Sequence, residues 1–445
     1  MNEKRLTDGG ILATLLQFAV PVFAALFLQA MYGAVDLLVV GKFAHVTEQS
    51  GVATGSMFMA VLGSVITGFA LGVTVLVAEA IGCRDEKRAG KGIGVGITLF
   101  GIIAVILTVL LMVFAKNIAV MMHAPENAMA QTMGYIRICG AGSIFIVTYN
   151  VIGAVFRGIG DSKTPLLTVA IACIVNIVAD LLLVIVFQMG AKGAALATVF
   201  AQAVSVVISL ILIRRRKLPF RLERTDIRLT PTYAKKIMMI GTPVALQELL
   251  VGFSFIFIQS TVNAMGVVES AGIGVGEKVC AFLMLVASAY MQSMAAFVAQ
   301  NNAAGKQERS KKALKYGIET ALAAGAAMGA LAFFGGSMLA AVFSNDAQVI
   351  AAAHSYLKAY AIDCLLTAAL FCFMGYFNGC ERTMFVMIQG IVGAFCVRVP
   401  LVYLFGKIGN GSLFLIGLAT PASSVIQIFL CVIAFLFFEK RAKQS

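Results

Sequence analysis

The feature that most constrains this chain is a series of apolar segments, each about twenty residues long, that recur from Ile11 to Phe438. A helix of about 20 mainly apolar residues spans the hydrocarbon core of a bilayer. Runs such as Gly96–Phe114 and Val425–Phe438 are apolar on every face, whereas strands of membrane β-barrels alternate polar and apolar residues. The sequence therefore predicts an all-α polytopic membrane protein with twelve transmembrane helices.

The composition agrees with a membrane protein and argues against other classes. Charged residues make up only 12% of the chain, about half their share in soluble domains. The net charge of +13 could indicate nucleic acid as a partner, but the basic residues cluster in the loops of one side, as in membrane proteins. No nucleic-acid partner is therefore expected.

Metal-binding and catalytic patterns are missing from the sequence. The nine cysteines form no Cys-x-x-Cys pair, and the three histidines are isolated, so no metal site is expected beyond a possible Na⁺ site. No nucleophile motif or nucleotide-binding loop is complete. The sequence does not predict an enzyme, and a cofactor other than a coupling ion is not expected.

Lysines and arginines fall in every second loop. They are concentrated at residues 84–91, 214–228 and 306–315 and after Glu439, and the alternate loops hold only Lys42, Lys116, Lys192 and Lys407. Since cytoplasmic loops carry the excess of basic residues, both termini are predicted to be cytoplasmic and the number of helices to be even.

The two halves of the chain repeat. Pro21 in FAVPVFAALFLQ aligns with Pro243 in IGTPVALQELLV, and Tyr135 in YIR aligns with Tyr356 in YLK, in almost the same register. AEAIGCRDEKRAGKGIGVGI from Ala78 aligns in the same way with AQNNAAGKQERSKKALKYGI from Ala299. Two pseudo-symmetric six-helix lobes follow, in the same orientation around a central cavity. The predicted domains are an N-terminal lobe at residues 1–213, a basic cytoplasmic linker at 214–232 and a C-terminal lobe at 233–445.

Four acidic residues lie within predicted helices: Asp36, Asp180, Glu248 and Asp363. A carboxylate at the centre of a membrane helix costs about 2.5–3.5 kcal/mol, so each suggests a function. Asn176 stands four residues before Asp180, on the same helix face, and Thr198 in the next helix can add a hydroxyl. Oxygen ligands of these kinds suit Na⁺, and a buried carboxyl pair can instead hold a proton. The alternative is that each acid is a paired or protonated packing residue. Glu79, Glu277 and Glu319 are given no role.

Pro21 and the small residues bear on helix shape and packing. A proline inside a helix removes a backbone hydrogen bond and bends the helix, so Pro21 predicts a bend in the first helix that is either bistable or static. The spacing Gly68-x-x-x-Gly72 predicts a close contact between helices.

A resemblance to a known family is clearest in two segments, YNVIGAVFRGIGDSKTPLLTVAIACIVNIVADLLLV from Tyr149 and VDLLVVGK from Val35. The chain resembles the multidrug and toxic compound extrusion (MATE) family over nearly its whole length. The resemblance implies twelve helices, two lobes and the export of organic cations in exchange for H⁺ or Na⁺. It implies a coupling site formed by Asp36, Asn176, Asp180 and Thr198, with Gln29 nearby and Pro21 as the bend. Some members place the ion on acids of the second lobe, whose positions match Glu248 and Asp363.

The function predicted on this basis is a secondary active antiporter that exports small lipophilic cations by alternating access. It is expected to act as a monomer in the bacterial cytoplasmic membrane. Adaptable side chains are predicted to meet the substrate: Gln29, Met31, Met57, Phe253, Phe257, Met284 and Met291. The main alternative is a related flippase or an exporter of a lipid-linked or other endogenous metabolite. A flippase should place basic residues in its cavity, with Arg137, Lys278, Lys358 and Arg398 as the candidates.

Overall fold

The structure is a computed structural model that describes residues 6–216, 218–408 and 412–442. Both termini, which are predicted to be cytoplasmic, lie outside these ranges. Every regular element within them is helical. The α-helices are α1 Ile11–Phe43, α2 Val46–Gly82, α3 Glu86–Val113, α4 Ala115–Met121, α5 Met129–Ala141, α6 Ser143–Ile159, α7 Lys163–Asp180, α8 Gly190–Arg215, α9 Pro231–Asn263, α10 Val267–Ala303, α11 Gln307–Ala341, α12 Ala347–Gly379, α13 Thr383–Ile391, α14 Val399–Ile408, α15 Leu413–Gly417 and α16 Ala419–Ala442. Two 3₁₀ turns, η1 Glu126–Ala128 and η3 Arg224–Asp226, and two π-helical segments, η2 Leu181–Val186 and η4 Val392–Arg398, complete the list.

The helices are long enough to cross a membrane. Within the described residues, eleven helices have the length and hydropathy of a membrane span. A further pair, Glu126–Ala141 and Ser143–Ile159, meets the same test as one span bent by 56°. The prediction of an all-α membrane protein with about twelve spans is therefore confirmed.

The chain divides into two compact units, which are named here unit 1 and unit 2. Unit 1 consists mainly of Val20–Ala245, and unit 2 consists of Asp8–Ala19 together with Leu246–Ser445. The first helix of each half is therefore shared: the start of α1 packs with unit 2, and the start of α9 packs with unit 1.

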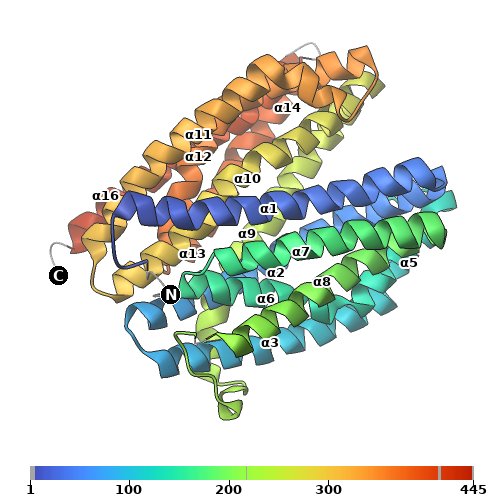
Figure 1. The fold of residues 1–445 in the computed structure, drawn as a ribbon. Coiled ribbons are helices and arrows are strands. Elements are labelled where there is room, and N and C mark those ends of the chain that lie inside the picture. Colours follow the sequence, from blue (N-terminus) through green and yellow to red (C-terminus); the bar gives the residue numbers. More distant parts are fainter. Residues whose placement is uncertain (1–5, 217, 409–411, 443–445) are drawn as a thin grey trace. The chain divides into compact units, whose positions relative to one another are not determined.

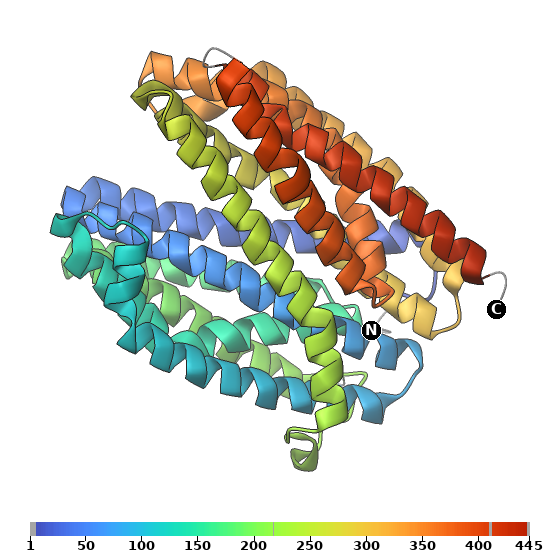
Figure 2. The same ribbon diagram turned by 180° about the vertical axis from the view of Figure 1, so that it is seen from behind.

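The two shared helices change units beside their prolines. The boundary in α1 falls just before Pro21, and the boundary in α9 falls just after Pro243. Both helices are continuous across the proline, as Figure 1 shows for α1 and Figure 2 for α9 in yellow-green. Because proline removes one backbone hydrogen bond, each helix is least supported where it changes units. A bend at Pro21 stays a prediction.

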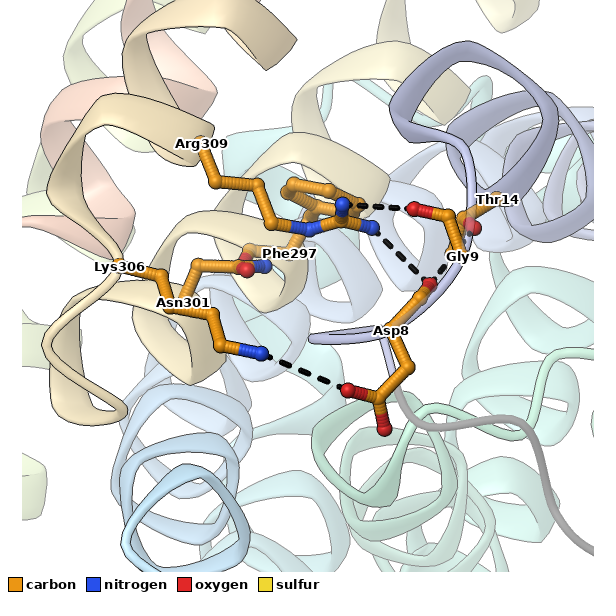
Figure 3. A network of polar contacts seen from close by, with 7 residues as sticks. All are labelled: Asp8, Gly9, Thr14, Phe297, Asn301, Lys306 and Arg309. Carbon is orange, nitrogen blue, oxygen red and sulfur yellow. Dashed lines mark hydrogen bonds and ion pairs between the residues drawn. The ribbon is translucent and has the colours of Figure 1, made fainter.

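Polar contacts hold the start of α1 on unit 2 (Figure 3). The guanidinium of Arg309 donates hydrogen bonds to the backbone carbonyls of Gly9 at 2.7 Å and Asp8 at 3.0 Å, and it lies over the ring of Phe297. The Lys306 ammonium is 3.4 Å from the Asp8 carboxylate. The turn before α1 is therefore bound to the connection between α10 and α11.

The repeat-related contacts hold the start of α9 on unit 1. The Lys236 ammonium is 2.6 Å from the Glu79 carboxylate, which also pairs with Arg88 at 3.4 Å. Arg88 and Arg309 occupy the same position in the aligned segments that begin at Ala78 and Ala299. The same connection in each unit thus holds the first helix of the other half.

Small residues let α2 approach the start of α9 closely. A Cβ atom on Gly68 would lie 2.7 Å from the Ala245 Cα atom, and one on Gly72 would overlap the Ile237 carbonyl. Such close backbone approach is typical of membrane helix interfaces, where small residues permit van der Waals packing. The close contact predicted from Gly68-x-x-x-Gly72 is therefore confirmed.

We expect Gly72→Ala to lower the melting temperature of the detergent-solubilised protein, because the new methyl group would collide with the backbone of Ile237. Gly63→Ala in the same helix is the matched control, since a Cβ atom there meets nothing within 4 Å. Alanine is favoured over glycine in a helix by about 1 kcal/mol, so Gly63→Ala should leave the melting temperature unchanged or raise it. Equal melting of the two variants would contradict the packing argument.

Candidate functional site

Three helices of unit 1 bring four predicted site residues together. Asp36 comes from α1, Asn176 and Asp180 from α7, and Thr198 from α8. The Thr198 hydroxyl donates a hydrogen bond to Asp36 Oδ2 at 2.9 Å. The side chains of Asp180 and Asn176 lie beside the same carboxyl group. Residues far apart in the chain thus form one cluster, which we call the unit 1 acid cluster.

The unit 1 acid cluster is buried and short of partners. Asp36 is 4% exposed, and Asn176 and Asp180 are fully buried. Asp36 Oδ1, both Asp180 carboxyl oxygens and both polar atoms of the Asn176 amide have no hydrogen-bond partner of normal geometry in the described part of the chain. Buried polar groups are nearly always satisfied, and a bound proton or cation could supply partners for these five atoms.

The backbone around Asp180 departs from a regular α-helix. Asn176 and Asp180 are four residues apart in α7 and therefore share one face, and the helix turns into the π-helical segment η2 directly after Asp180. π-helical turns inside α-helices occur often at functional sites. The sequence predicts the shared face of these residues, but it contains no signal for η2.

Two tyrosines that sequence reasoning missed lie next to the unit 1 acid cluster. Tyr32 interacts with Gln29, Gln202 and Asp36, and Tyr135 lies beside Asp36 and Thr198. Tyr32 stands one helical turn before Asp36, which was an available signal, whereas Tyr135 comes from α5 and only the fold places it here. Gln29, a predicted substrate residue, is linked to the cluster through Tyr32.

The two predicted acids of unit 2 have different surroundings. Asp363 in α12 is 1% exposed and accepts hydrogen bonds from Ser424 at 2.6 Å and from the Thr367 hydroxyl at 2.9 Å. Glu248 in α9 is half-buried, and it is not among the groups that interact with the Asp363 carboxyl. The structure therefore does not bring Glu248 and Asp363 together as it brings Asp36 and Asp180 together.

A further acid, Glu277, lies within α10 beside Tyr356. Its Oε1 atom is enclosed and has no hydrogen-bond partner in the residues that the structure describes. Sequence reasoning gave Glu277 no role, although an acid inside an apolar helix is itself a signal.

The predicted substrate side chains are distributed over both units. Met31 and Met57 are exposed on α1 and α2 of unit 1, and Phe253 and Phe257 are exposed on α9 in unit 2. Met284 and Met291 of α10 are half-buried and pack against hydrophobic clusters of unit 2. Exposed methionine and phenylalanine side chains can adapt to varied apolar ligands.

In the described ranges, no group of three or more His, Cys, Asp or Glu side chains is placed to hold a metal ion. The cysteines other than Cys83 are free thiols. The unit 1 acid cluster, with two carboxyls, an amide and a hydroxyl, fits a hard monovalent cation or a proton better than a transition metal.

Comparisons with known proteins agree with this architecture. The family profile MatE matches residues 21–182 and again residues 243–404. The first match begins at Pro21 and the second at Pro243, so the profile repeats in the register that aligns these two prolines. The probable multidrug resistance protein YoeA of Bacillus subtilis (strain 168) is 23% identical over 95% of this chain and 93% of its own length.

Two further proteins extend the comparison. A protein of Shewanella oneidensis named FAD transporter is 27% identical over 65% of each chain. A solved structure of a multidrug resistance MATE family transporter, in an outward-facing conformation, superposes with a TM-score of 0.90 at 20% identity, covering 99% of this chain and 97% of that one. Because the two profile matches cover more than half of the residues, the chain belongs to the MATE family of multi-pass membrane transporters for multidrug efflux and is not an enzyme.

Proposed function

We propose that this transporter exports small lipophilic organic cations by alternating access, in exchange for H⁺ or Na⁺ bound at Asp36, Asn176, Asp180 and Thr198. The observation that carries the proposal is the unit 1 acid cluster. Its two carboxyls lie against each other in a buried place, with five polar atoms unpartnered. Bound H⁺ or Na⁺ would satisfy these atoms, and an ion that binds one conformation better than another shifts the transporter between conformations.

The energetics of ion exchange are sufficient for export. Moving one charge through a membrane potential of 100 mV is worth about 2.3 kcal/mol, and about 1.4 kcal/mol corresponds to a tenfold ratio. One net charge per cycle would therefore sustain a substrate gradient of roughly fifty-fold.

The substrate class rests on charge and on relatives. The curated relative YoeA is named a probable multidrug resistance protein, and the unit 1 acid cluster offers negative charge to a cation. The exposed side chains of Met31, Met57, Phe253 and Phe257 offer apolar contact. A lipophilic cation combines both properties. We propose that the transporter works as a monomer in a bacterial cytoplasmic membrane with both termini in the cytoplasm.

A second candidate is the export of an endogenous metabolite, because one relative is named an FAD transporter. A flippase for a lipid-linked pyrophosphate would need several basic residues gathered together. In the described residues, Arg137 is exposed on α5, Lys278 and Lys358 contact the rings of Phe343 and Phe333, and Arg398 is buried. The acidic groups of the unit 1 acid cluster favour a cationic substrate over a pyrophosphate.

We expect Asp36→Asn and Asp180→Asn each to lower the efflux of a fluorescent lipophilic cation by at least about tenfold, because each removes a carboxyl from the buried pair whose charge is costly in the membrane. Efflux is measured in cells with an imposed pH gradient and then with an imposed Na⁺ gradient, which identifies the ion. Glu319→Gln is the control, since Glu319 forms an exposed pair with Lys315 at 4.0 Å, and such pairs contribute little.

Three outcomes of this assay separate the hypotheses. Undiminished efflux in both acid variants would exclude the unit 1 acid cluster and direct attention to Glu248 and Asp363. Loss of efflux in the Glu319→Gln control would indicate general damage to the protein. Efflux of FAD, with none of the cation, by membrane-inserted wild type would favour the metabolite exporter.

The hydroxyl of Thr198 provides a second test. Thr198→Val removes the hydrogen bond to Asp36, and a hydrogen bond to a charged group contributes about 1.5–3 kcal/mol. We expect the concentration of coupling ion that gives half-maximal efflux to change by about tenfold or more, whereas Thr198→Ser keeps it. Thr98→Val is the matched control, because within the described residues the Thr98 hydroxyl bonds to the Gly94 carbonyl of its own helix and to no acid. Identical ion dependence in Thr198→Val and Thr98→Val would argue against a role for Thr198 in ion binding.

A further inference from the structure

The repeat pairs each member of the unit 1 acid cluster with a residue of unit 2. The register that aligns the two matches of the family profile, Pro21 with Pro243, also aligns Leu-Ala-Thr at 196–198 with Leu-Ala-Thr at 418–420. It pairs Asp36 with Ile258, Asn176 with Arg398, Asp180 with Val402, and Thr198 with Thr420. Unit 2 therefore keeps the threonine, has no carboxylate at either position, and carries an arginine in place of the amide.

Hydrocarbon fills the positions of the two missing acids. Ile258 and Val402 are 1% and 0% exposed, and they belong to one hydrophobic cluster of unit 2 together with Tyr356. Tyr356 aligns with Tyr135, which lies beside Asp36 in unit 1. The surroundings are thus retained, but a mobile cation would meet no carboxylate at these positions.

Arg398 places a cation inside unit 2. It is 6% exposed, its Nη1 atom donates to the Ser254 hydroxyl at 3.1 Å, and its guanidinium lies 4.7 Å from the centre of the Phe255 ring. Neither Ser254 nor Phe255 carries a charge. A buried guanidinium in a membrane protein needs an anion nearby.

Asp363 is the nearby anion. The groups of unit 2 that act electrostatically on Arg398 are Asp363, Tyr356 and Tyr360, and Asp363 is the acid among them. The two charges act on each other through space, since no direct hydrogen bond or ion pair joins their side chains in the described residues. The two carboxyl oxygens of Asp363 accept hydrogen bonds from Ser424 and Thr367. In the register that aligns Tyr135 with Tyr356, the position of Asp363 is occupied in unit 1 by Gly142. At these aligned positions the acid and the base therefore occur in unit 2 only, and an ionised carboxylate beside a guanidinium would carry no net charge.

We propose that Arg398 is a fixed cation of unit 2, at the position where unit 1 binds an exchangeable ion, and that Asp363 is its permanent counter-ion rather than a second ion-binding site. This inference rests on the proposed ion exchange in unit 1. It implies that Asp363 adds no coupling ion to those bound in unit 1.

The charge pair can be tested without any transport measurement. Asp363→Asn and Arg398→Gln each leave one buried charge unpaired, so both should lower the melting temperature in detergent, because breaking a buried pair is strongly destabilising. The double variant Asp363→Asn/Arg398→Gln removes both charges and should melt closer to wild type than either single variant. Lys358→Gln is the control, since Lys358 lies over the Phe333 ring and its removal leaves no acid unpaired among the described residues. Additive destabilisation in the double variant would overturn the pair.

Transport by the double variant tests the role of Asp363. The purified protein is reconstituted into liposomes, and the coupling ions moved per substrate are obtained from the membrane potential at which net transport stops. We expect the double variant to retain efflux within about threefold of wild type and the same stoichiometry, because the two opposite charges are removed together and stability is largely kept. A stoichiometry reduced by one ion, or inactivity despite restored melting, would show that Asp363 binds a coupling ion. Absence of efflux in wild type would instead refute the proposed function, and the melting experiment would still decide the charge pair.

Discussion

The core of a bilayer contains no water, so polar and charged groups there must find their hydrogen-bond and charge partners within the protein. The rest of this structure depends on that constraint. Helices satisfy the backbone within each span, so the remaining cost falls on a few side chains. Asp36 and Asp180 in unit 1 have one hydroxyl partner between them, from Thr198. In the proposed function, a proton or cation that binds and leaves this cluster takes the place of the missing partners.

The second unit meets the same constraint in another way. Arg398 stands at the position equivalent to Asn176, and Asp363 stands near it with two hydroxyl partners. A nearby guanidinium and two hydroxyl donors stabilise a carboxylate without a bound mobile ion, whereas two adjacent carboxyls have no such positive group. In the proposed roles of Asp36, Asp180 and Arg398, the two halves of one repeat differ, because unit 1 binds an exchangeable ion and unit 2 holds a fixed charge.

The repeat also explains how the two units are connected within the chain. α1 and α9 each begin on one unit and continue in the other, and each passes its proline at the change. Arg309 and Lys236 hold the two starts through polar contacts at equivalent connections. Since backbone support is weakest at a proline, the segments on either side of Pro21 and Pro243 are joined by the least rigid turn of each helix.

The sequence by itself determined the all-α membrane class, the number of spans, the repeat, and the presence of Asn176 and Asp180 on one helix face, because these follow from local hydropathy and helical periodicity. The resemblance of its motifs added Asp36 and Thr198 to that set. Only the tertiary structure decided that Tyr32 and Tyr135 border the cluster, that Glu248 lies apart from Asp363, and that Arg398 lies near Asp363. These side chains belong to helices that are far apart in the sequence. A local sequence pattern does not determine which of them come together when the helices pack.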